Sequence, residues 1–173
     1  MKLSVTCAAL AFTGVLSAQG LAAEGKVHFS GNITAESCTI NSSDINQTVE
    51  LGTVTSALFD AAGDKSNAVD FSINMTGCPA TVASVQTKFD GVPDPDNTDL
   101  LALDSASTAS AVGIGLEETD GTPIPLHTAS REVTVESDTH AATLTYQARY
   151  VATAAQVSPG TANGVTQFSL NYN

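Results

Sequence analysis

The side chains that could carry catalysis or hold a metal are few and lie far apart along the chain. The three histidines are His28, His127 and His140, and they do not have the spacing of a zinc motif. The sequence contains neither the Gly-x-Ser-x-Gly elbow of a hydrolase nor a phosphate-binding loop. The pair Gly113-x-Gly115 lacks the third glycine of a dinucleotide-binding loop. The pattern therefore predicts no enzyme, no cofactor and no metal.

One acidic segment has oxygen ligands of the kind that calcium prefers. Its carboxylates are Asp90, Asp94, Asp96 and Asp99. The spacing is not that of an EF-hand, and two prolines within the segment stiffen it. We interpret it as a solvated loop.

The N-terminus has the pattern of a secretory signal peptide. Lys2 gives a positive start, residues 3–16 form an apolar run, and residues 17–23 are small and weakly polar. The run is too short to span a membrane. The sequence therefore predicts a signal peptide at residues 1–22 and export of the mature chain. Cleavage after Ala22 is favoured, and Ala23 and Ala18 are the alternative cleavage sites, each with Leu at the third-last position.

Two cysteines remain once the predicted signal peptide, which contains Cys7, is removed. They are Cys38 and Cys78. An even pair in an oxidising compartment predicts a disulfide. A metal site at this pair would need further Cys or His ligands close by, and the sequence has none at the right spacing.

Composition and charge point to a folded, acidic domain. The chain has 173 residues, of which 42% are hydrophobic and 14% charged, which fits one domain with accessory segments. Its net charge is -12 and it has only six Lys and Arg residues. A nucleic-acid partner is therefore excluded, because phosphate binding needs a basic patch.

Apolar and polar residues alternate in short runs with turn residues between them, and no run has the 3.6-residue period of a helix. Strict alternation is typical of half-buried strands. The predicted strands are residues 27–33, 49–54, 68–75, 84–89, 112–116, 132–135, 142–151 and 165–172. Asp120-Gly121 is a hairpin signal. The pattern predicts an all-β sandwich.

Several segments, in order along the chain, resemble type 1 fimbrial major subunits, which are pilins of the chaperone–usher class. The segments are residues 25–33 followed by Cys38, residues 74–79 around the second cysteine, residues 145–150, Gly160, and residues 168–173 with an aromatic residue next to last. The resemblance covers the whole mature chain. It implies an all-β fold: an incomplete immunoglobulin-like sandwich that lacks its last strand and is completed by a donor strand from a neighbouring subunit.

The resemblance also implies that two parts of the chain have different roles. Residues 23–33 are expected to be an N-terminal extension that serves as the donor strand, and residues 34–173 the pilin domain. The donor residues implied are Gly25, Val27, Phe29, Gly31 and Ile33. The residues implied at the groove edge, where a chaperone also binds, are Gly160, Phe168, Leu170 and Tyr172.

The implied function is that of a structural subunit of an adhesive fimbria. Its partners would be a periplasmic chaperone, an outer-membrane usher and further fimbrial subunits, with which it forms a homopolymer by donor-strand exchange. Its location would be the cell surface, reached through the periplasm. The alternative is a monomeric surface or tip β-sandwich that binds a host glycan. A tip adhesin of this class would have two domains in about twice the length, so the sequence favours the polymerising subunit.

Overall fold

The computed structural model describes residues 26–31 and 37–173. The chain divides into two units, residues 1–33 and residues 34–173. In the first unit, residues 26–31 form no regular secondary structure, so the described part of the predicted strand 27–33 is not a strand in the single chain. The predicted signal peptide, Gly25 and Ile33 lie outside the described residues, so those predictions are not tested.

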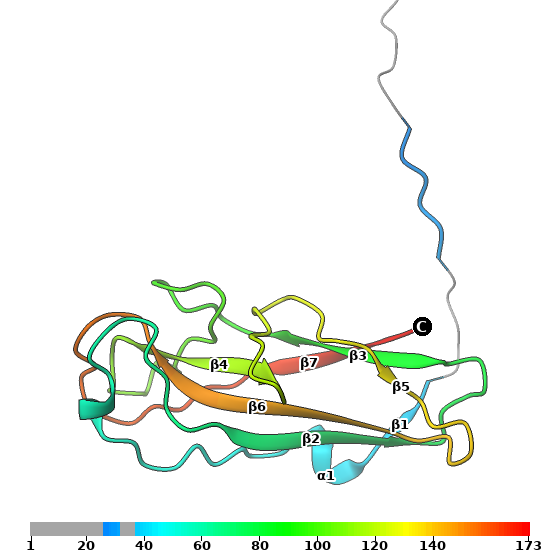
Figure 1. Cartoon of the computed structure of the whole chain (residues 1–173), viewed down its shortest axis with the longest axis horizontal. Helices are drawn as coiled ribbons and strands as arrows, with labels where there is room; N and C mark the ends of the chain where they lie inside the picture. The colour runs from blue at the N-terminus through cyan, green and yellow to red at the C-terminus, as the bar shows by residue number, and fades with distance from the viewer. Residues whose placement is uncertain (1–25, 32–36) are drawn as a thin grey trace, which may run out of the picture. The chain divides into compact units, whose positions relative to one another are not determined.

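Residues 37–173 form two antiparallel sheets (Figure 1). The first has the strand order β1-β2-β6-β4 and the second the order β5-β3-β7. The strands are β1 (Thr39–Ile40), β2 (Val69–Thr76), β3 (Ser84–Asp90), β4 (Val112–Glu118), β5 (Val133–Thr134), β6 (Ala142–Ala152) and β7 (Gln167–Tyr172). The short α-helix α1 (Ser42–Ile45) and the 3-10 helix η1 (Ser56–Leu58) are the helices among the described residues. The predicted all-β sandwich is confirmed.

The strands follow the alternation in the sequence. On β3, Val85, Thr87 and Phe89 are buried while the residues between them are half-exposed. On β6, Leu144 and Tyr146 are buried in the same way. Successive side chains of a strand point to opposite faces, so each of these rows covers one side of the core.

An aromatic cluster at the centre of the core joins the two sheets. Phe71 of β2, Phe89 of β3 and Tyr146 of β6 have ring centroids 5.2–6.0 Å apart, in edge-on or tilted arrangements. Aromatic pairs prefer these geometries to face-to-face stacking. The Tyr146 hydroxyl lies 2.9 Å from the hydroxyl of Ser130, so this polar group is satisfied inside the core.

Cys38 and Cys78 form a disulfide, as predicted. Both cysteines are buried members of the core. The bond ties the start of the domain to the end of β2, where β1 pairs with Met75 and Thr76.

The turn predicted at Asp120-Gly121 is present, whereas the acidic segment is not wholly a solvated loop, since Asp90 ends β3 and Asp94 is buried. Asp120 and Gly121 form a tight turn after β4, in which the Gly121 amide donates to Glu118 and Gly121 has a φ of +81°. Asp94 in the acidic segment accepts hydrogen bonds from the amides of Asp96 and Asn97, which folds that loop back on itself. Among the described residues, no group of three or more His, Cys, Asp or Glu side chains could hold a metal, and no helix is long and apolar enough to cross a membrane.

One expected strand of the domain is not formed. Residues 49–54 have the alternating pattern, but the structure leaves them without a strand partner. They run beside the core as one side of an open groove.

Candidate functional site: an open groove along the core

A groove with a volume of about 820 Å³ opens between the two sheets. One wall is formed by residues 44–53 and the other by residues 162–168. Its floor consists of inward-facing side chains from both sheets, mostly apolar: Phe71, Ile73, Phe89, Leu101, Ile114, Leu116, Ala148 and Tyr150. Six of these side chains are themselves 0–7% exposed, and Phe71 and Tyr150 are half-buried, so the groove runs along the core and reaches it chiefly at these two rings.

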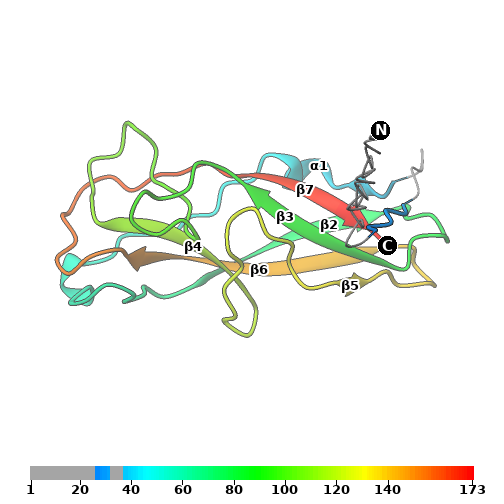
Figure 2. The same ribbon diagram turned by 90° about the horizontal axis from the view of Figure 1, so that it is seen from above.

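The β7 strand has one paired edge and one free edge. It pairs with β3 and with no other strand among the described residues; Figure 2 shows β3 between β7 and β5. Ser84 and Asn173 exchange both of their backbone hydrogen bonds. Because ladder bonds alternate along an antiparallel pair, the amides and carbonyls of residues 168, 170 and 172 point away from β3.

The opposite wall is equally unpaired. No backbone-to-backbone hydrogen bond of residues 47–54 is formed with the described part of the chain. The side chains of Val49 and Leu51 nevertheless pack against the core, so the segment alternates as a strand would. The groove therefore presents free backbone groups on both walls and apolar side chains between them. A strand edge in this state is a template for another strand.

The β7 side chains that pack against the core are the ones that the family resemblance implied at the groove edge, and their contact with a chaperone stays a prediction. Phe168, Leu170 and Tyr172 lie on one face of β7, are half-buried, and pack against the core. They lie opposite Phe89, Thr87 and Val85 of β3, respectively. Val165, just before the strand, is 71% exposed although it lines the groove.

Tyr150 stands where the groove meets a second hollow of about 360 Å³. Its hydroxyl donates to the carbonyl of Ala162, with a distance of 2.8 Å, and so fixes the ring against the wall. Burial, together with the negative charge of Glu50, raises the pKa of Tyr150. The second hollow extends the groove beyond this ring and is lined by apolar side chains that include Phe59 and Val112.

Gly160 lies ahead of β7, on the second hollow. A Cβ atom at this position would overlap the backbone of Thr108 and Ala109. The glycine is therefore needed for the close approach of two backbone segments. Whether it also contacts a chaperone stays a prediction.

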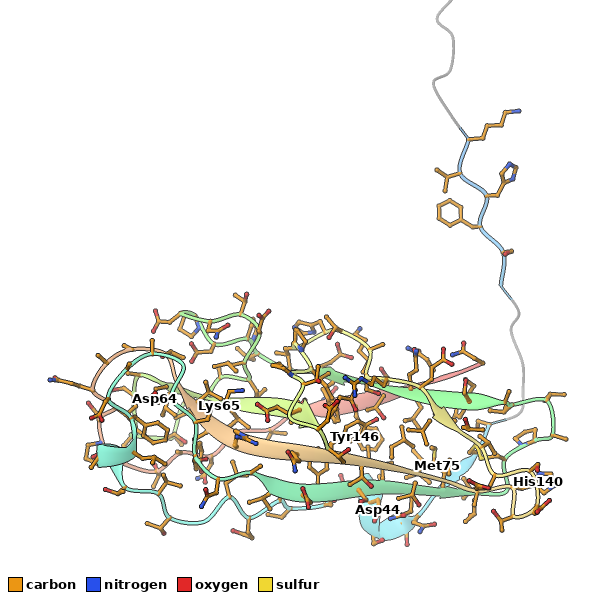
Figure 3. The ribbon with its side chains drawn as sticks, in the orientation of Figure 1. Asp44, Asp64, Lys65, Met75, His140 and Tyr146 are labelled. Atoms are coloured by element: carbon orange, nitrogen blue, oxygen red, sulfur yellow. A yellow bond between two sulfur atoms is a disulfide. The ribbon has the colours of Figure 1, made fainter. Side chains whose placement is uncertain are left out.

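The rim of the groove is acidic. Asp44, Glu50 and Asp104 line it, and none of the lining residues is Lys or Arg. The Asp44 carboxylate accepts hydrogen bonds from the Asn74 amide at 2.8 Å and from the Asn74 side chain at 2.9 Å. The Asn74 amide bond, with a further bond from Ser43, lowers the pKa of Asp44. Asp44 is therefore a negative charge that is held in place on the rim; Figure 3 shows it at the short helix α1, below β2 in that view.

Of the predicted donor residues, Val27, Phe29 and Gly31 are described. The side chains of Val27 and Phe29 are 77% and 92% exposed. The assignment of all five donor residues stays a prediction. Residues 44–53 were not predicted from the sequence to form a wall of the groove. The alternating apolar residues Val49 and Leu51 are a signal that could have indicated it.

The topology defines the class of protein. It is an immunoglobulin-like sandwich that lacks its last strand. The fold is similar to that of the P pilus rod subunit PapA, with a TM-score of 0.66, 19% identity, and coverage of 79% of this chain and 99% of PapA. It is also similar to a subunit in the structure of a chaperone–usher pilus, with a TM-score of 0.65, 21% identity, and coverage of 87% and 96% of the two chains.

Sequence comparison gives the family. The model of the "Fimbrial protein" family matches residues 27–173, so the chain belongs to the fimbrial protein family. The chain is 35% identical to the fimbrial-like protein FimF of Salmonella typhimurium, over 94% of this chain and 92% of that protein. It is 38% identical to the type 1 fimbrial subunit of Klebsiella pneumoniae, over 86% and 83% of the two chains. The resemblance to type 1 fimbrial subunits is confirmed.

Proposed function

We propose that this protein is a structural, non-catalytic subunit of an adhesive fimbria, and that it polymerises head to tail by donor-strand exchange. The open groove carries the proposal: its walls have unpaired backbone groups, and its floor consists of side chains of the hydrophobic core. An added strand would form hydrogen bonds with these backbone groups and would cover the side chains of the floor. The family of the chain and the names of its relatives support the same function.

The strand that fills the groove is residues 23–33 of another subunit. Val27 and Phe29 alternate with polar residues, so both side chains can enter one groove while Lys26 and His28 face outward. Burying each apolar side chain contributes roughly 1.5–3 kcal/mol. Since each subunit uses one end as a donor and the groove as an acceptor, the contact is heterologous and does not close, and the product is a fibre.

Export precedes assembly in this proposal. Residues 1–22 are removed as a signal peptide, and residues 34–173 fold as the pilin domain in the periplasm. A chaperone holds the free edge of β7 there, because an open apolar edge aggregates if it is left uncovered. It delivers the subunit to an outer-membrane usher, where the donor strand of another subunit takes its place and the fibre grows at the cell surface.

The experiment is a gel and a micrograph of one preparation. The mature protein is run on a denaturing gel with and without boiling, and is imaged by electron microscopy. Heat-sensitive oligomers together with filaments are expected. A monomer that needs no chaperone and forms no filaments would instead fit a complete β-sandwich that acts as a glycan-binding module.

A further inference from the structure

The basic side chains of the domain are all engaged in ion pairs within it. The pairs are Lys65–Glu117, Arg149–Glu117, Lys88–Asp90 and Arg131–Asp120, with N–O distances of 2.6–3.0 Å. Residues 37–173 contain no other Lys or Arg. The acidic rim of the groove therefore has no free basic side chain within this range to balance it.

Lys26 is the remaining described cation, and it lies in the proposed donor strand. Residues 26–31 contain no Asp or Glu, so Lys26 has no acidic partner within this segment. Its position is one residue before Val27, so it faces away from the groove when Val27 faces inward. Lys26 thus brings a positive charge to an acceptor groove whose rim carries acids, while Glu24 of the same donor strand lies outside the described residues.

The position of Asp44 along the groove follows from its contacts with β2. Asp44 is held by Asn74, three residues beyond Phe71 toward the end of β2. Phe71 contacts Phe89 of β3 across the core, with ring centroids 6.0 Å apart. Phe89 lies directly opposite Phe168 of β7. Phe71 and Phe168 are therefore at the same level of the groove.

The same strand pairings place Asp44 and Asn171 at the same position along the length of the groove. The short connection of residues 77–83 places the end of β2 and the start of β3 at one end of the domain. Gln86 is three residues from Phe89 in the direction of that end, and it lies opposite Asn171. Figure 3 shows Asp44 between Lys65, on the left, and His140, at the right end of the domain.

The positions of Phe168 and Asn171 along the groove indicate how a donor strand can be placed against β7. The last strand of an immunoglobulin-like sheet runs antiparallel to its neighbour. We place the largest donor side chain, Phe29, opposite Phe168, at the level where Phe71 and Phe89 are in contact. In an antiparallel pair this places Lys26 opposite Asn171.

We propose that Lys26 of the incoming subunit forms an ion pair with Asp44 of the accepting subunit, and that this pair selects the register of the inserted strand. The inference rests on the proposed donor-strand exchange. A slip of two residues would move Lys26 by about 7 Å along the strand and separate the charges. Charge pairs at the edge of an interface commonly act on register and association rate in this way.

The test is a double-mutant cycle on fibres of the full-length mature chain. The variants are Lys26→Gln, Asp44→Asn and the double variant, and the readout is the rate of subunit dissociation in detergent. Asparagine at position 44 can still accept the bonds from Asn74. Each single variant should dissociate about two- to fivefold faster than wild type, as expected for an exposed ion pair. The double variant should be no faster than the single variants, and 1 M salt should remove the wild-type advantage.

Glu50→Gln is the matched control. Glu50 lines the same groove but is nearer Tyr150, toward the other end, and it should show no coupling to Lys26. Coupling to Glu50 in place of Asp44, additive single variants, or salt-independent dissociation of wild-type fibres would each overturn the ion pair. Lys26→Gln changes no residue of the domain, so its salt dependence remains informative if Asp44→Asn accumulates poorly. Fibres formed by a chain without residues 23–33 would instead overturn donor-strand exchange itself.

Discussion

Phe168 of β7 lies directly opposite Phe89 of β3, and the backbone amide and carbonyl of Phe168 point away from that partner, toward the open groove. The same residue therefore closes the core with its side chain and leaves a strand edge open with its backbone. Leu170 and Tyr172 repeat this arrangement at two-residue intervals. The edge of β7 can be completed by a strand whose own inward side chains have a spacing of two.

The spacing of Val27 and Phe29 leads to a prediction about fibre stability. Phe29→Ala should make fibres dissociate at a lower temperature, because truncation of a buried Phe costs about 3–5 kcal/mol. The measurement is the loss of oligomers on unboiled gels as the temperature is raised. His28→Ala is the matched control, since His28 has the opposite parity and should change the midpoint little. Equal effects of the two substitutions would mean that the strand does not insert with the predicted face inward.

The disulfide leads to a second prediction. Cys38→Ser should lower the free energy of unfolding by about 4 kcal/mol, the chain-entropy value for a loop of about 40 residues. It should also lower the amount of protein that accumulates in the periplasm, because the bond anchors the segment that continues into the groove wall. Cys38→Ser/Cys78→Ser should behave like the single variant. Unchanged accumulation and melting would show that the bond does not stabilise the domain.

The Asp120–Arg131 ion pair leads to a prediction about pH. The hydrogen bond from Arg131 is the main cause that lowers the pKa of Asp120 to about 2, from a usual value of 3.8. A lowered pKa in the folded state stabilises the fold above pH 3.8, and this contribution is lost as the pH falls from about 4 to about 2. The difference in melting temperature between wild type and Asp120→Asn should therefore shrink over that range.

The control for the pH prediction is Asp138→Asn, at a carboxylate that forms no ion pair with another described residue. This variant should follow the wild-type pH profile. An Asp120→Asn variant whose profile runs parallel to that of wild type from pH 5 to pH 2 would contradict the role of the ion pair.

Strands that pair within the chain were predictable from sequence, because alternation marks both the strand and its buried face. The predicted segments 68–75, 84–89 and 142–151 correspond to β2, β3 and β6 within one or two residues. Residues 49–54 alternate in the same way, yet form no strand in the single chain. Alternation encodes which side chains are buried, whereas a strand also needs a hydrogen-bonding neighbour. At the groove that neighbour is missing.

Other features of the site could not be predicted from sequence. The helix α1 has four residues, which is too short for helical periodicity to be visible. The contact of Asp44 with Asn74 joins residues 30 positions apart, and it depends on how β1 brings the two segments together. The need for glycine at position 160 arises from the backbone of residues 108–109, far away in the chain.

The most direct test of donor-strand exchange is deletion of residues 23–33 from the mature chain. Wild type and the deletion variant would be expressed with the chaperone and usher, and compared by electron microscopy and on unboiled gels. We predict that the variant still binds the chaperone, because the groove and the β7 edge are intact, and that it forms neither filaments nor an oligomer ladder. Filaments formed by the deletion variant would contradict the assignment of residues 23–33 as the polymerising strand.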